Sequence, residues 1–288
     1  QAVEKIEAVL TDAKYIVRKL EGYKSKEELL EAVADVDAMI IRSDIVDKEV
    51  LERASKMELV VRAGTGYDNI DLAACRESNV VVMNTPGQNA NAVAELVLAM
   101  MLVSARNNFD GTSGFELANR AIGLYGFGSI AQAVHKLARA FGMKSYAYAP
   151  SLSAEKISEA GATPVNSLAD LFEHQYVSLH VPLTEETRGS VNKALLSAMP
   201  HDGTLINTAR PEIVNEDDLL ETLRVRSNFG YLCDATPRKF EEMKEAAGDR
   251  YMKRVIFTQQ GLGGQTIEAN INAGVAAANQ TVNFFEKG

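Results

Sequence analysis

The chain has 288 residues, a length that suits one large domain or two domains of ordinary size. Hydrophobic residues make up 46% and charged residues 24% of the sequence, proportions typical of a globular protein with a sizeable core. The net charge of -9 argues against nucleic acid or an anionic membrane as the main partner, so an anionic ligand would need a local pocket.

Features tied to cellular location and metal binding are sparse. The opening stretch QAVEKIEAVL carries charges where a signal peptide needs an apolar core. The apolar run from Ala92 to Val103 contains Glu95 and is too short to span a bilayer. Cys75 and Cys233 form neither a CxxC pair nor a metal-binding spacing. We therefore expect a cytoplasmic protein with reduced thiols, no membrane partner and no bound metal.

Short β-rich runs alternate with helical runs in the first third of the chain. Strands are predicted at 37–44, 57–64 and 79–85, with a helix at 48–55. A long apolar helix is predicted at about 88–106. Such alternation predicts βαβ units and a mainly parallel sheet.

A second set of alternating elements follows that long helix. A helix is predicted to end at about Phe141, and the last one runs from Thr266 to about Phe285. Two sets of βα units therefore predict an α/β protein with two doubly wound, Rossmann-like parallel-sheet domains. The second set of strands is predicted at 120–128 (with a turn), 144–149, 176–182, 203–209, 229–235 and 254–259.

A glycine-rich turn lies between a predicted strand and a predicted helix. Gly126, Gly128 and Ala131 form the pattern G-x-G-x-x-A, which allows a tight turn, close approach of a pyrophosphate and close helix packing. A dinucleotide site usually has a carboxylate about 20 residues later that binds the ribose. The next strand ends at Ala149 instead, so either the ribose is bound less tightly or another nucleotide is tolerated.

Several segments, in one order along the chain, resemble the D-2-hydroxyacid dehydrogenases. Within that family they are most similar to the D-3-phosphoglycerate dehydrogenases of a short subgroup that uses lysine in place of the catalytic histidine. Relative to these proteins, an opening strand and a short C-terminal extension are expected to be missing from this sequence. The matching segments are IIRSD (40–44), VVRAGTGYDNIDL (60–72), VVMNTPGQNANAVAELV (81–97), VSLHVPLTEETRGSVN (177–192), LINTARPEIVNEDDL (205–219) and GQTIEANINAGVAAANQ (264–280).

The resemblance implies a domain organisation and a reaction. The substrate-binding domain would comprise 1–84 and 266–288, and the dinucleotide-binding domain 85–265, with the long helix carrying a homodimer contact. The cofactor would be NAD, with NADP not excluded, and the partner a small anionic 2-hydroxy acid, as in serine biosynthesis. Hydride would pass between the substrate and the nicotinamide, while an acid/base moves the hydroxyl proton and an arginine binds the carboxylate.

The resemblance also assigns residues. Arg210 would bind the substrate carboxylate through its planar guanidinium, and Asp234 would accept a hydrogen bond from the nicotinamide amide. His180 is expected to be a packing residue rather than a proton carrier. Asn84 matches a substrate-loop position, but a role in forming the turn fits it equally well. Cofactor contacts are expected at Gly126, Gly128, Ser129, Ile130, Ala149, His180, Val181, Pro182, Thr208, Ala209 and Asp234. Substrate contacts are expected at Arg42, Ser43, Gly64, Thr65, Gly66 and Asn84.

The expected acid/base is missing from its loop. The strand at 254–259 leads into Thr258, Gln259, Gln260 and Gly261, where relatives have histidine or lysine, so Gln260 occupies the position of the catalytic group. Glutamine cannot accept the hydroxyl proton, and losing such help costs about 10²–10⁴-fold in rate. The chain is then a binding relative without turnover, an enzyme using another group such as Lys239 or Lys244, or a protein in which these residues have been altered.

Overall fold

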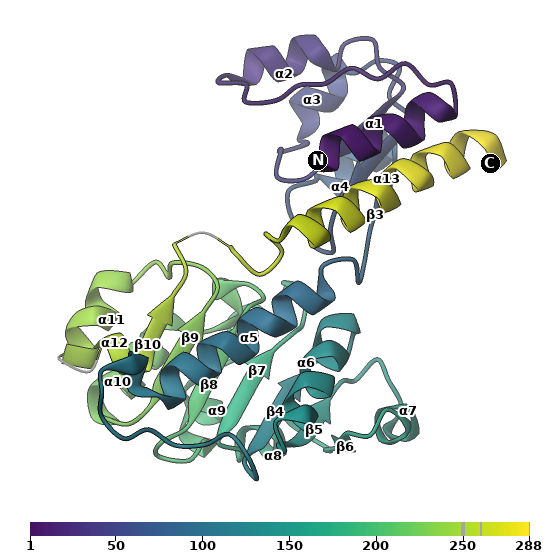
Figure 1. Cartoon of the computed structure of the whole chain (residues 1–288). Helices are drawn as coiled ribbons and strands as arrows, with labels where there is room; N and C mark the ends of the chain where they lie inside the picture. The colour runs from purple at the N-terminus through teal and green to yellow at the C-terminus, as the bar shows by residue number, and fades with distance from the viewer. Residues whose placement is uncertain (249–250, 260, 288) are drawn as a thin grey trace. The chain divides into compact units, whose positions relative to one another are not determined.

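The computed structural model describes residues 1–248, 251–259 and 261–287 (Figure 1). The chain divides into two compact units, Gln1–Asn89 with Gly264–Gly288, and Ala90–Gly263. The division predicted from the sequence, 1–84 with 266–288, lies a few residues away. Every strand pair in the described part of the chain is parallel, as expected for the Rossmann-like α/β class.

The smaller unit is built on a parallel sheet. Within its described residues, the strand order is β1 (Ala38–Ile41), β2 (Leu59–Arg62), β3 (Val81–Asn84). Val60 packs on one side of the sheet, whereas its neighbours Leu59 and Val61 pack on the other, so both faces are covered. The helices of this unit are α1 (Ala2–Asp12), α2 (Lys26–Ala32), α3 (Lys48–Arg53), α4 (Leu72–Glu77) and α13 (Ile267–Lys287).

Small residues bring the two ends of the sequence together in this unit. Ala273 and Ala277 of α13 are fully buried against the sheet. On another side of α13, a Cβ on Gly274 would lie 2.7 Å from Cδ1 of Ile6 in α1, so glycine permits this close approach. Figure 1 shows α1 running beside α13, which explains how the last helix returns to the first unit.

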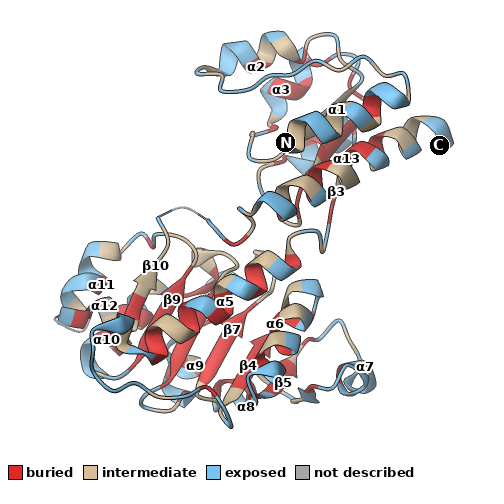
Figure 2. Cartoon of the chain, in the orientation of Figure 1, coloured by how far each residue is buried: buried red, intermediate tan, exposed pale blue. Residues whose placement is uncertain are grey.

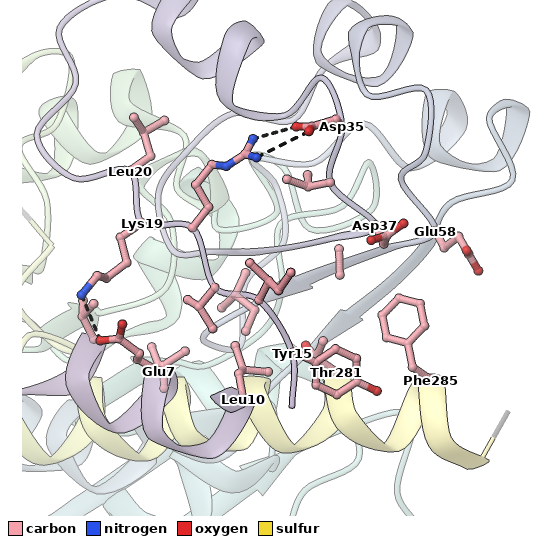
Figure 3. Close-up of a pocket in the computed structure, with 18 of the residues that line it drawn as sticks. Glu7, Leu10, Tyr15, Lys19, Leu20, Asp35, Asp37, Glu58, Thr281 and Phe285 are labelled. Atoms are coloured by element: carbon pink, nitrogen blue, oxygen red, sulfur yellow. Dashed lines mark hydrogen bonds and ion pairs between the residues drawn. The ribbon is translucent and has the colours of Figure 1, made fainter. Parts of the chain in front are cut away.

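A cavity of about 670 Å³ lies at the open edge of β1 (Figure 3). Its walls come from α1, α13, the irregular segment 15–21 and the sheet, and ion pairs join Arg18 to Asp35 and Lys19 to Glu7. The lining reaches residues that directly precede β1 and β2, at the amino ends of these strands. Ligands of parallel α/β sheets bind at the carboxyl ends, so this cavity is not where a substrate is expected.

The larger unit contains a longer parallel sheet, whose order within the described residues is β10-β9-β8-β7-β4-β5-β6. The chain starts in the middle at β4, moves outward through β5 and β6, and returns to the other side of β4 with β7. The position between β4 and β7 is therefore the topological switch point, where such sheets bind ligands. The strands are β4 (Ala121–Tyr125), β5 (Lys144–Tyr148), β6 (Thr163–Pro164), β7 (Tyr176–Leu179), β8 (Thr204–Asn207), β9 (Gly230–Cys233) and β10 (Val255–Phe257).

Helices cover both faces of this sheet. Tyr176 and Ile206 point into the core beneath α5 (Ala90–Ala105) and α6 (Ser129–Ala140), while Val177 and Leu205 point into the opposite core. Figure 2 shows the central strands buried throughout. Each such side chain contributes about 1.5–3 kcal/mol by leaving water. The remaining helical segments are η1 (Asn107–Phe109), α7 (Ala154–Glu159), α8 (Leu168–Phe172), α9 (Lys193–Ala198), η2 (Pro211–Ile213), α10 (Glu216–Val225), α11 (Phe240–Ala247) and α12 (Tyr251–Arg254).

Side-chain caps explain where several helices begin. The Asp71 carboxylate accepts a hydrogen bond from the Ala74 N–H at the start of α4. The Asn215 side chain accepts from the N–H groups of Asp217 and Asp218 at the start of α10. Each cap stabilises its helix by about 0.5–2 kcal/mol, because these N–H groups have no partner within the helix.

Among the helices that the structure describes, none is both long enough and apolar enough to cross a membrane.

The packing of β4 against α8 leads to a prediction about stability. A Cβ on Gly123 would lie 2.9 Å from the Leu171 carbonyl oxygen and 3.0 Å from its Cγ, contacts that neither backbone can relieve easily. We expect Gly123→Ala to destabilise the larger unit by about 1–3 kcal/mol. Urea denaturation followed by circular dichroism measures this, since the chain contains no tryptophan. Gly261→Ala, whose Cβ would meet only an ordinary contact at 3.7 Å, is the control and should change stability little.

Candidate active site

The carboxyl edge of the larger sheet gathers the residues that the sequence predicts for cofactor binding. Each strand from β4 to β10, apart from the short β6, leads directly into one of these residues or into the loop that lacks the acid/base. Because the strands are parallel, these segments lie along one edge. The segments are the Gly126 turn after β4, Ala149 after β5, His180 after β7, Thr208 to Arg210 after β8, Asp234 after β9 and Thr258 onward after β10.

The two glycines of the turn have different environments. The Gly126 N–H donates to the Tyr148 carbonyl oxygen at 2.9 Å, its φ is +89°, and a Cβ there would lie 2.7 Å from the His180 carbonyl oxygen. Gly128 is exposed at the N-cap of α6, and a Cβ there would meet no described atom within 4 Å. Gly126 is therefore needed by the fold, whereas Gly128 leaves space for a ligand.

The start of α6 can bind an anion. Ser129 is exposed and Ile130 partly exposed in the first turn of this 12-residue helix, whose first backbone N–H groups lack partners within the helix. The positive end of the helix dipole adds to the attraction for phosphate. Together with Gly128, this arrangement fits a pyrophosphate.

Ala149 stands where a ribose-binding carboxylate is usual. It directly follows β5, whose last carbonyl is bonded to the Gly126 turn, and it is buried. The next two residues, Pro150 and Ser151, are exposed and carry no charge. The end of β5 therefore offers no carboxylate to bind a ribose diol or to repel a 2′-phosphate.

His180 lies beside the Gly126 turn at the switch point. The residue as a whole is partly exposed, but its Nε2 is enclosed and has no hydrogen-bond partner among the described residues. Burial lowers the pKa of His180 to about 3, so its ring is neutral at neutral pH and is a poor proton carrier. Val181 packs close to Gly126, and the Pro182 carbonyl accepts a hydrogen bond from the Thr187 hydroxyl at 2.7 Å.

Arg210 is held by a turn that depends on Asn207. The Asn207 side chain is buried at the end of β8, where it accepts from the Ala209 N–H at 3.0 Å and donates to the Arg210 carbonyl at 2.9 Å. The half-buried Arg210 donates from Nη1 to the Ala209 carbonyl at 3.0 Å. Asn207 was not predicted as a site residue, although an asparagine at a strand end two residues before a turn is a recognisable signal.

Asp234 contacts the loop that follows β10. One carboxylate oxygen accepts from the Thr258 hydroxyl and the Leu262 N–H, and the other accepts from the Gly263 N–H, each at 2.7 Å. Its predicted contact with nicotinamide stays a prediction, since a carboxylate has about four acceptor positions and three are used here. Gln260 lies outside the described residues.

The lysines named as replacements for the missing acid/base lie on or next to α11. Lys239 forms an ion pair with Asp217 of α10, which raises the pKa of Lys239. It therefore stays protonated at neutral pH and is a poor proton acceptor. Lys244 is exposed on α11.

In the smaller unit, two arginines lie at the carboxyl ends of neighbouring strands. Arg62 is in register with Ile41, which precedes Arg42. Arg42 donates to the Ala63 carbonyl at 3.1 Å and to the Gly264 carbonyl at 2.7 Å, and burial lowers its pKa. Sequence analysis missed Arg62, although it lies within the matching segment VVRAGTGYDNIDL at the end of a predicted strand.

The loop after β2 completes this edge. Gly64 has φ +151°, and the Arg62 guanidinium occupies the place that a Cβ on Gly64 would need. The Asn84 side chain donates to the Thr65 carbonyl at 2.7 Å, so Asn84 holds the loop, and any contact with substrate stays a prediction. Gly66 is partly buried, and Ser43 is exposed after Arg42.

Over the described parts of the chain, no group of three or more His, Cys, Asp or Glu side chains is arranged to hold a metal ion.

The chain is similar to known proteins. Residues 91–259 match the family described as D-isomer specific 2-hydroxyacid dehydrogenase, NAD binding domain. The D-3-phosphoglycerate dehydrogenase of Methanocaldococcus jannaschii is 32% identical over 271 residues, 89% of this chain and 51% of that protein. The glyoxylate reductase of Thermococcus litoralis is 31% identical over 277 residues, 89% of this chain and 82% of that protein. The chain thus spans about half the length of the first relative.

A solved structure matches over the whole chain. The NAD⁺-bound 3-phosphoglycerate dehydrogenase of Entamoeba histolytica has a TM-score of 0.91 and 39% identity, and the match covers 100% of this chain and 91% of that one. The open space at Gly128 and the exposed start of α6 fit NAD in the larger unit. Gly128, Ser129 and Ile130 would hold its pyrophosphate.

The contrast between the two glycines predicts two different defects. Gly128→Ala should leave stability unchanged but weaken NAD⁺ binding on the order of tenfold, because the added Cβ projects into the ligand's space. Gly126→Ala should lower stability by more than about 1 kcal/mol, because of its positive φ and the His180 contact. Thermal melting and calorimetric titration with NAD⁺ separate these effects. Equal loss of stability in both variants would contradict this assignment.

The uncharged end of β5 predicts weak discrimination between cofactors. We expect NAD⁺ and NADP⁺ to bind within about tenfold of one another, because no carboxylate repels the 2′-phosphate. Ala149→Asp should then favour NAD⁺, whereas Ala149→Asn, which adds no charge, should change the ratio less. Calorimetry of the unmodified protein is the primary measurement. A strong preference for NAD⁺ without any substitution would contradict the prediction.

Proposed function

Because this chain belongs to the D-isomer specific 2-hydroxyacid dehydrogenase family, we propose that it oxidises the D-2-hydroxy acid 3-phosphoglycerate with NAD⁺. The observation that carries the proposal is Arg210, fixed by Asn207 at the same sheet edge as the glycine turn. The reaction would serve serine biosynthesis. The named activities of the relatives in Methanocaldococcus jannaschii and Entamoeba histolytica support this choice of substrate.

Arg210 would bind the substrate carboxylate. A guanidinium offers two parallel N–H donors that match the two oxygens of a carboxylate, and it stays charged at any physiological pH. Its Nη1 donates to the Ala209 carbonyl at 3.0 Å, and a guanidinium carries five N–H donors in all. Anchoring through Asn207 limits the motion of the Arg210 backbone, which lowers the entropy lost on binding.

Arg42 and Arg62 would bind the phosphate group. Arg42 directly follows β1, and Arg62 is the last residue of the neighbouring strand β2. The backbone of the 64–66 loop lies next to Arg62. A phosphate carries more charge than a methyl or hydroxymethyl group, so two arginines favour 3-phosphoglycerate over glyoxylate or lactate. Ser43, Gly64, Thr65, Gly66 and Asn84 are proposed to complete the substrate loops.

Proton transfer is the step for which this chain lacks the expected acid/base. NAD⁺, held by Gly128, Ser129 and Ile130, would supply the acceptor for the hydride on the carbon that carries the substrate hydroxyl. Arg210 would orient the acid and polarise the group being oxidised, but the described loop residues Thr258, Gln259 and Gly261 have no group that accepts a proton at neutral pH. Neutral His180, with its enclosed Nε2, does not replace it. Turnover should therefore be about 10²–10⁴-fold below that of an enzyme with an acid/base.

Two properties of the whole protein extend the proposal. A homodimer is supported by the exposed Phe109, which is 71% accessible just beyond α5, and by the partly buried Leu102 and Val103 near the end of that helix. A cytoplasmic location is supported by Cys75 and Cys233, which are buried free thiols that need no oxidising compartment.

Restoring a proton acceptor tests the reaction. We expect slow NADH formation from 3-phosphoglycerate and at least about tenfold faster turnover in Gly261→Lys, because lysine supplies the missing base. The site has room, since a Cβ on Gly261 would lie 3.7 Å from the Asp234 carbonyl oxygen. NADH absorbance measures both rates, and Gln260→His provides a second restored variant.

Matched variants control this experiment. Gly261→Met adds a flexible chain without a base and should not raise the rate. Arg210→Lys should lower kcat/KM by at least about tenfold, because one ammonium cannot reproduce the paired donors. NAD⁺ binding without turnover in any variant, at high enzyme concentration, would overturn the proposed reaction and leave a nucleotide-binding protein.

A further inference from the structure

The Asp234 carboxylate binds both ends of the loop from Thr258 to Gly263. At the first end, it accepts from the Thr258 hydroxyl at 2.7 Å. At the other end, it accepts from the backbone N–H groups of Leu262 and Gly263, also at 2.7 Å each. Bonds to an ionised acceptor are about twice as strong as neutral ones, so this is a strong set of contacts for one side chain.

Backbone contacts fix the same loop from the β9 side. The Thr258 N–H donates to the Cys233 carbonyl at 3.0 Å, directly before Asp234. A Cβ on Gly263 would lie 2.8 Å from the Asp234 carboxylate and 3.2 Å from a methyl carbon of Val93 in α5. Glycine at 263 therefore lets the loop approach both Asp234 and α5.

Gln259 and Gly261 are exposed, and the contact of Gln259 with the Thr236 hydroxyl is long, at 3.5 Å. The family resemblance locates the acid/base in this part of the loop, with Gln260 in its place. The position of any side chain there relative to the sheet edge depends on how firmly Thr258, Leu262 and Gly263 are held.

We propose that Asp234 is a positioning residue, which closes the 258–263 loop and so sets where a proton-transferring side chain at its centre would lie. Its fourth acceptor position remains for the nicotinamide amide, so one carboxylate would contact both the loop and the cofactor. The functional part of this inference rests on the proposed dehydrogenase reaction. The closure of the loop does not, and it is measurable without turnover.

Asp234→Asn is the first test, because it preserves shape and removes charge. The amide nitrogen would face an N–H donor of the loop, so at least one of the three bonds is lost. We expect amide hydrogen exchange at Leu262 and Gly263 to become at least about tenfold faster in the ligand-free protein, with the same melting temperature. Glu241→Gln, an exposed carboxylate on α11, is the matched control and should leave exchange unchanged.

Thr258 provides a second, independent test. Thr258→Val removes the hydroxyl donor at nearly constant volume, whereas Thr258→Ser keeps it. Exchange at Leu262 and Gly263 should rise in the valine variant and stay close to the original rate in the serine variant. Equal behaviour of the two would show that packing, rather than the bond to Asp234, orders the loop.

Two further measurements separate loop closure from cofactor contact. If Asp234 acts only on nicotinamide, Asp234→Asn weakens NAD⁺ binding but not ADP-ribose binding, and leaves loop exchange unchanged; that result would overturn the proposal. If Asp234 positions the loop, Asp234→Asn also removes most of the kcat gain from Gly261→Lys at saturating NAD⁺. Exchange that depends on Asp234 without any turnover would support the closure and contradict only the dehydrogenase reaction.

Discussion

The close contact at Gly126 is the constraint on which the larger unit depends, because three neighbouring strands meet there. Its N–H is bonded to the end of β5, and its Cα faces the His180 carbonyl after β7 with no room for a side chain. The turn is therefore fixed by the sheet rather than by the loop sequence alone. Fixing it places the start of α6 and the open space at Gly128 on the carboxyl edge. Arg210 and Asp234 follow other strands of the same sheet and share that edge.

The strands of both units carry local sequence signals, which is why they were predictable. Strands buried on both faces are continuous apolar runs, such as those containing Val60 and Ile206, and their carboxyl ends locate the loops in which sites occur. Helix α1 was not predicted, because Leu10 is the only one of the described residues of this helix that is buried and the helix packs against α13, far away in sequence. The short β6 likewise depends on its pairing with β5.

The site residues also divide into those found from the local sequence and those whose roles depend on contacts between distant segments. A spacing motif identifies Gly126 and Gly128, because their chemistry is tied to spacing along the chain, whereas Arg210 was assigned by the family resemblance. Asn207, Arg62 and the loop contacts of Asp234 were missed, because their roles arise from bonds between backbone segments that a motif does not encode. The roles inferred from family resemblance, including those of Thr208 and Ala209, depend on ligand contacts and stay predictions.

The overall charge of -9 does not conflict with an anionic substrate, because binding depends on the local field. Arg42 shows how such a field is maintained: its described partners are the carbonyls of Ala63 and Gly264, which orient the guanidinium without neutralising it. Burial lowers its pKa, yet from so high a reference value that the group stays charged near neutrality. A carboxylate partner would have cancelled that charge. Bonding to carbonyls instead leaves a half-buried, oriented cation, which is a better partner for a phosphate than a solvated surface arginine.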